Sequence, residues 1–113
     1  MQVRIHSHGF HANRELRRAI ERRLDLSLGR FGSRVRDVQV WLSDDSGLRG
    51  GLDKTVRIEL DLSGTRELRV EQTATSWQEA VDMATGRMGR TAAREIERRR
   101  NRRLHTDLAT FAW

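Results

Sequence analysis

The strongest chemical signal in this sequence is a run of arginines near its end. Residues 87–103 contain eight arginines and two glutamates, so this segment carries a formal charge of +6, equal to the net charge of the whole chain. Arginine presents a planar set of donors that matches phosphate oxygens in pairs and stacks on exposed bases. A local excess of positive charge is typical of proteins whose partner is densely negative. The segment therefore predicts a nucleic-acid partner, with RNA favoured over DNA.

Four of these arginines recur at intervals of three, four and four residues. They are Arg87, Arg90, Arg94 and Arg98. On a helix, this spacing places the four side chains in one ridge along a flank. Arginines four residues apart repel each other by a few tenths of a kcal/mol per pair, and an anion lying along the ridge would relieve that repulsion. We expect the ridge to bind RNA phosphates. An apolar stripe beside it predicts the core-facing side: Trp77, Ala80, Val81, Ala84, Met88 and Ala92.

Other arginines are candidates for the same contact surface. Residues 13–30 read as a helix that carries Arg17, Arg22 and Arg23, although interspersed acidic residues fit a merely solvated face equally well. Arg4, in the first predicted strand, could join the patch of either helix. Residues 37–86 hold ten acidic and five basic residues. We expect five of the acidic side chains to mark the opposite, non-binding face: Asp37, Glu59, Asp61, Glu67 and Glu71.

Catalytic and metal sites are weakly supported. His6, His8 and His11 have the pattern HxHxxH, but they fall in a strand and a loop with no acidic residue nearby. Asp44 and Asp45 lie in a Ser-Asp-Asp-Ser-Gly segment, where such residues usually serve turns. We expect no metal, no cofactor, no small-molecule substrate and no enzymatic activity. A small metal-dependent hydrolase that uses the histidines remains an alternative from another class.

Length and composition indicate one domain. The chain has 113 residues, of which 36% are hydrophobic and 34% charged, and it has no cysteine. That excludes disulfides and thiolate metal sites and is compatible with a reducing cytosol. No apolar run approaches the roughly 18 residues of a membrane span, and the N-terminus lacks the apolar core of a signal peptide. We therefore expect a cytoplasmic protein with no membrane partner, comprising a domain over 1–103 and a C-terminal tail over 104–113.

The periodicity of apolar residues predicts an α+β fold. Alternation indicates strands over 2–6, 37–42, 55–62 and 68–74, and helical spacing indicates helices over 13–30 and 77–103. Asn13 is the predicted N-cap of the first helix, and Ser63-Gly64-Thr65 is predicted to form a tight turn. The order is β-α-β-β-β-α, which gives a four-stranded sheet with two helices packed on one face, as in double-stranded-RNA-binding domains. A helix over 77–103 would be roughly 40 Å long, whereas a strand of about seven residues spans roughly 23 Å. The last turns must therefore overhang the sheet or fray.

Two segments resemble the ribosome hibernation-promoting factor family, which includes the ribosome-associated inhibitor proteins and was once named for sigma-54 modulation. They are VQVWLSDDSGLRGGLDKTVRIELDL and AVDMATGRMGRTAAR. The second places Arg87, Arg90 and Arg94 where the family has basic residues. ELRRAIERRL resembles the family's first helix, with Arg17 and Arg23 at basic positions. The resemblance covers about residues 1–98 and indicates a short form, without the second, dimerising domain of long members.

The resemblance implies a stress or stationary-phase protein that inhibits translation. Family members bind 16S rRNA of the small ribosomal subunit in the channel where mRNA and the A- and P-site tRNAs would lie. We expect the protein to be a monomer off the ribosome. The alternative is a domain that binds double-stranded RNA or DNA and acts away from the ribosome. Two features have open meanings: Gly86 and Gly89 could allow close approach to RNA, and Trp41 could stack on a base, although packing over the sheet is favoured.

Overall fold

The computed structural model describes residues 1–45 and 53–111, with side chains to Leu104. Most of the loop predicted after residue 42, the side chain of Phe111 and Trp113 lie outside the described residues.

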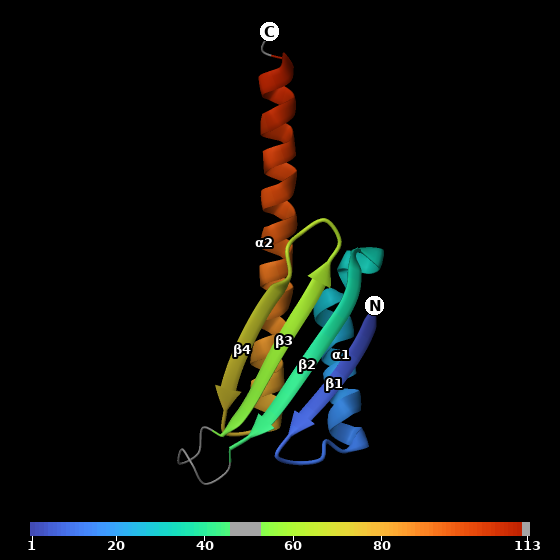
Figure 1. Cartoon of the computed structure of the whole chain (residues 1–113), viewed down its shortest axis with the longest axis vertical. Coiled ribbons are helices and arrows are strands. Elements are labelled where there is room, and N and C mark those ends of the chain that lie inside the picture. Colours follow the sequence, from blue (N-terminus) through green and yellow to red (C-terminus); the bar gives the residue numbers. More distant parts are fainter. Residues whose placement is uncertain (46–52, 112–113) are drawn as a thin grey trace.

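The described chain forms one mixed sheet covered by two helices. Its elements are β1 (Gln2–His8), α1 (Arg14–Leu28), the 3-10 helix η1 (Gly29–Arg34), β2 (Val35–Asp44), β3 (Lys54–Leu62), β4 (Leu68–Ala74) and α2 (Trp77–Phe111). The sheet order is β1-β2-β3-β4, with β1 parallel to β2 and the other neighbours antiparallel. Both helices lie on the same face of the sheet, behind it in Figure 1. The predicted α+β fold and element order are confirmed.

The core lies between the sheet and the helices. Strand residues alternate, so Val38, Val40 and Leu42 of β2 point inward and are at most 1% exposed. The predicted apolar stripe of α2 packs on the same face of the sheet, over β3 and β4: Ala80, Val81, Ala84, Met88 and Ala92 are all buried. Trp77 is half-buried at the start of α2 and stacks on Phe10, with ring centroids 4.9 Å apart. This packing fixes which flanks of α2 remain exposed.

Helix α1 begins as its sequence predicts and ends earlier. The Asn13 side chain accepts a hydrogen bond from the backbone N–H of Leu16 at 2.8 Å, which satisfies one of the free N–H groups of the first turn. The predicted end near Arg30 is wrong, because α1 stops at Leu28 and the chain tightens into η1. Gly32, inside η1, has φ +57°, a conformation that favours glycine.

Helix α2 begins at an N-terminal cap and extends beyond the end of the sheet. The Ser76 hydroxyl accepts from the backbone N–H of Glu79 at 3.2 Å, and the Glu79 carboxylate accepts from the Thr75 hydroxyl at 3.4 Å. With 35 residues the helix is about 52 Å long, whereas the 10 residues of β2 span about 33 Å. The predicted overhang is therefore confirmed (Figure 1), and the helix continues through Arg103 to Phe111.

Two glycines of α2 have different surroundings. A Cβ built on Gly89 would lie 3.0 Å from the backbone oxygen of Ser27 in α1, whereas a Cβ on Gly86 would meet only the guanidinium of Arg90, at 3.4 Å. Gly89 is also buried. Gly89 therefore serves the close contact between α1 and α2, and the helix α1, not RNA, covers its backbone.

Alanine at these two positions should have opposite effects. Gly86→Ala should raise the free energy of unfolding by up to about 1 kcal/mol, because alanine favours the helix and the tip of Arg90 moves easily. Gly89→Ala gains the same propensity but must push the last turn of α1 away, so we expect a stability below wild type. Thermal unfolding followed by circular dichroism measures both, and equal stabilisation would contradict the close helix contact.

Candidate nucleic-acid interface

The arginine ridge of α2, defined as Arg87, Arg90, Arg94 and Arg98, lies on the flank of the helix away from α1. All four side chains are exposed. Gly89 and Asp82 face α1, where Asp82 pairs with Arg23. Arg94 and Arg98 instead line a hollow beside the start of β4. The predicted helical ridge is thus present, with its charges directed to solvent.

The ridge keeps most of its charge unneutralised. Among the residues that the structure describes, no carboxylate pairs with Arg87, Arg90 or Arg94. Arg98 approaches Glu95 at 3.9 Å, but its side chain is 68% exposed, and a pair this exposed contributes little. Since a phosphate competes with no internal partner here, the ridge can donate charge-assisted hydrogen bonds to RNA phosphates.

The arginines of α1 are more committed to the protein. The Arg17 side chain is half-buried, and its Nε donates to the backbone oxygen of Ala12 at 3.1 Å. The Arg23 Nε lies 2.8 Å from Asp82 Oδ1 across the interface of the two helices. Arg22 is exposed. Of the three arginines predicted on this helix, Arg22 is the one most open to a partner. A phosphate that binds Arg23 would have to displace the Asp82 carboxylate or share the guanidinium with it.

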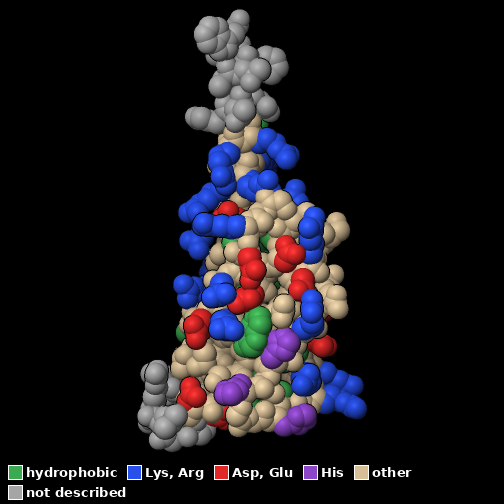
Figure 2. Space-filling model, in the orientation of Figure 1, with side chains coloured by type: hydrophobic (Ala, Val, Ile, Leu, Met, Phe, Trp, Pro, Cys, Tyr) green, Lys and Arg blue, Asp and Glu red, His purple; other side chains and the backbone are tan. Residues whose placement is uncertain are grey.

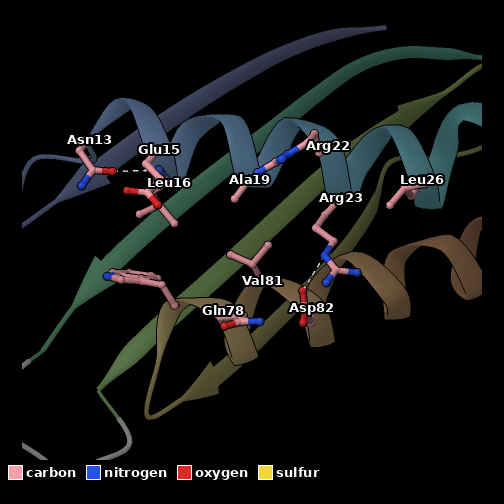
Figure 3. Close-up of a pocket in the computed structure, with 11 residues that line it drawn as sticks. Asn13, Glu15, Leu16, Ala19, Arg22, Arg23, Leu26, Gln78, Val81 and Asp82 are labelled. Atoms are coloured by element: carbon pink, nitrogen blue, oxygen red, sulfur yellow. Dashed lines mark hydrogen bonds and ion pairs between the residues drawn. The ribbon is translucent and has the colours of Figure 1, made fainter.

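A groove of about 660 Å³ runs between α1 and the first turns of α2. Figure 3 shows its apolar floor, which includes Leu16, Ala19 and Val81, with the Arg23–Asp82 pair crossing it. Its lining residues are Asn13, Glu15, Leu16, Ala19, Arg22, Arg23, Leu26, Trp77, Gln78, Val81 and Asp82. The groove lies on the α1 side of α2, so it is separate from the ridge.

Arg4 does not join the arginines of either helix. Val3 and Ile5 of β1 pack against the core, so Arg4 between them points to the opposite face of the sheet. There its Nη2 lies 3.0 Å from Asp37 Oδ2. The expectation that Arg4 extends a helical patch is wrong, because strand alternation carries it to the face that no helix covers.

The open face of the sheet carries the acidic residues, as predicted. Figure 2 views this face and shows acidic side chains among basic ones over the strands. Glu59 pairs with Arg69 at 2.8 Å and lies 3.8 Å from Arg57. A hydrogen bond to Glu59 raises the pKa of Glu67 above its ordinary value, since two carboxylates that share a proton resist ionising together. This mixed, acid-rich surface disfavours contact with a polyanion.

Trp41 and His6 also belong to the open face. Trp41 lies between His6, whose ring stacks on it at 5.1 Å, and the Arg57 guanidinium, 4.6 Å above its ring. His6 is also hydrogen-bonded to Gln39, at 3.0 Å. Trp41 therefore packs over the sheet, as favoured from the sequence. Within residues 1–45 and 53–104, no three His, Cys, Asp or Glu side chains converge as metal ligands would.

Sequence reasoning missed a second group of arginines. Arg34 of η1, Arg66 of the β3–β4 connection and Arg99 of α2 line two hollows at the turn between β3 and β4. The Ser-Gly-Thr turn was visible in the sequence, but nothing in its spacing indicated that Arg34 and Arg99 would reach it.

Comparison with known proteins identifies the family. A family model described as Sigma 54 modulation protein / S30EA ribosomal protein matches residues 3–100. The chain belongs to this family. The match spans all four strands, α1 and the part of α2 that carries the ridge. Membership of the sigma 54 modulation protein / S30EA family confirms the resemblance drawn from the sequence.

Two solved bacterial structures have the same fold as this chain. A ribosomal subunit interface protein from Coxiella burnetii is 14% identical with a TM-score of 0.69, and the alignment covers 83% of this chain and 96% of that one. The N-terminal domain of Protein Y from Thermus thermophilus is 23% identical with a TM-score of 0.56, covering 82% and 93%. At these identities the likeness is one of fold. No curated protein matches the chain.

Proposed function

We propose that this protein binds the small ribosomal subunit through arginine contacts to 16S rRNA and inhibits translation on idle ribosomes. It occupies the channel where mRNA and the A- and P-site tRNAs lie, under stress or in stationary phase. It acts in the cytoplasm, as a monomer off the ribosome, without catalysis or a cofactor.

The exposed arginine ridge of α2 carries the proposal. Three of its four members have no acidic partner within the described part of the chain, and they project from a domain of the sigma 54 modulation protein / S30EA family. The Coxiella burnetii protein is named a ribosomal subunit interface protein, which supports the same partner here. The acid-rich open face gives the molecule one orientation toward RNA.

The mechanism we propose is steric exclusion. Phosphate contacts supply affinity that is independent of sequence, and the shape of folded rRNA supplies selectivity. The described molecule measures 64 × 26 × 18 Å, which is long and narrow enough to lie along a channel while its ridge tracks a phosphate backbone. Inhibition then follows from occupancy alone and requires no reacting group.

Co-sedimentation with salt-washed small subunits tests this function. We expect about one molecule to pellet per subunit, and we expect prior binding of tRNA and mRNA to suppress it, because both would fill the same channel. The affinity of the protein for a duplex RNA serves as the comparison. Pelleting that ignores tRNA, or binding to duplex RNA as tight as to the subunit, would favour the alternative of an RNA-binding domain acting away from the ribosome.

A further inference from the structure

The turn between β3 and β4 is held in place from several sides. The backbone N–H of Ser63 donates to the backbone oxygen of Arg34 at 2.7 Å, which ties the turn to the end of η1. The Thr65 hydroxyl lies 3.0 Å from the backbone oxygen of Leu62. Gly64, at the tip, has φ +83°. The turn is therefore a fixed support and not a loose loop end.

Arg99 of α2 packs directly on this turn. Its guanidinium takes the space that a Cβ on Gly64 would occupy. Arg99 lines a surface hollow of about 460 Å³ together with Arg66, Arg98 and Arg102. It also lines a second hollow of about 660 Å³, together with Arg34, Arg100 and Arg103. Gly64, Thr65 and Arg99 line both hollows, so the two adjoin at Arg99.

The two hollows are strongly positive. Seven arginines line them: Arg34, Arg66, Arg98, Arg99, Arg100, Arg102 and Arg103. One acidic residue, Glu95, joins them from the described part of the chain, and its side chain is only 12% exposed. Like charges gathered this closely repel one another, and a ligand with closely spaced negative charges would remove that repulsion. We call these seven residues the arginine cradle.

We infer that the arginine cradle binds two successive phosphates of an RNA strand, one in each hollow, with Arg99 donating to both. The cradle adjoins the ridge, because Arg66 and Arg98 also line the hollow that contains Arg94. An RNA backbone that follows α2 would thus continue around the end of the sheet to Arg34. The identity of the partner rests on the proposed function, whereas the phosphate site itself does not.

A triple variant tests the cradle against the ridge. Arg34→Gln, Arg66→Gln and Arg99→Gln together should flatten the slope of log affinity against log salt by about 1.4 units for a labelled single-stranded RNA, because each of the two phosphates contributes about 0.7. The same loss is expected for small ribosomal subunits. An affinity and slope equal to wild type would overturn the cradle. If the wild-type protein does not bind small subunits but the triple variant binds RNA more weakly than wild type, the proposed function is wrong and the phosphate site at the cradle is supported.

Gly64→Asn tests the geometry without changing charge. Asparagine tolerates positive φ, so the turn can persist, but its Cβ must expel the Arg99 guanidinium from the place where the hollows adjoin. We expect weaker RNA binding with thermal stability close to that of wild type, and unchanged binding would overturn the role of Arg99. Sodium triphosphate is the competitor that separates the sources of phosphate. We expect an unlabelled oligonucleotide to displace the labelled RNA at a lower phosphate concentration than triphosphate does. Equal displacement by the two competitors at the same phosphate concentration would contradict an RNA strand as the ligand.

Discussion

Replacing Arg87, Arg90 and Arg94 together by glutamine should reduce the slope of log affinity against log salt by roughly 2–3 units when small ribosomal subunits are titrated. Each ridge arginine that neutralises a phosphate releases counterions on binding, and that release disappears with the charge. The affinity itself should fall most at low salt. Sedimentation or fluorescence anisotropy over a series of salt concentrations measures both quantities.

The open face of the sheet supplies a control with the same change of charge. Arg4, Arg57 and Arg69 each lie within 4 Å of a carboxylate on that face. Their joint replacement by glutamine lowers the net charge equally, yet it should leave the slope within about one unit of wild type. If both triple variants changed the slope alike, net charge and not the ridge would govern binding, and the proposed interface would be wrong.

Met88→Ala should cost about 2–5 kcal/mol of unfolding free energy, a large part of what a small domain has. Met88 is fully buried on the face of α2 that packs on the sheet, one residue from Arg87. Removal of its side chain leaves a cavity where the helix meets the core. Urea denaturation followed by circular dichroism should show a lower midpoint with a similar slope.

Met83 provides the matched control for this substitution. It has the same side chain and lies in the same helix, but it is 44% exposed. Met83→Ala should change the unfolding free energy by less than about 0.5 kcal/mol, since few contacts are lost at the surface. Similar effects at the two positions would mean that α2 is not docked on the sheet by its apolar stripe.

Local patterns in the sequence were sufficient for the elements and for the faces of α2. Apolar alternation located the strands, Asn13 marked the start of α1, and the three-and-four spacing separated the ridge from the buried stripe. The overhang also followed from the sequence, because the helix had to be longer than any strand. Its extension to Phe111 fits a segment that, after Gly89, lacks glycine and proline, the two residues least favourable inside a helix.

Contacts between distant segments were beyond the sequence. The role of Gly89 depends on Ser27, 62 residues earlier, and the cradle depends on Arg34 meeting Arg99 across the turn at Gly64. No spacing rule encodes such distances, because they arise when α1 and α2 pack on the sheet. Arg4 is a different case: the alternation of Val3 and Ile5 already placed it on the face away from the helices, and that local argument should have decided its position.

The separation of charge between the two faces gives the molecule a directional electric field. Acidic side chains gather on the uncovered sheet, whereas arginines line α2 and the end of the sheet. A polyanion therefore exerts a torque on the approaching protein before any contact forms, turning α2 toward it and the sheet away. Because the protein is oriented before contact, a larger share of its collisions with the polyanion leads to binding, and the association rate rises. High salt would blunt this alignment as well as the contacts themselves, because ions shorten the reach of the field.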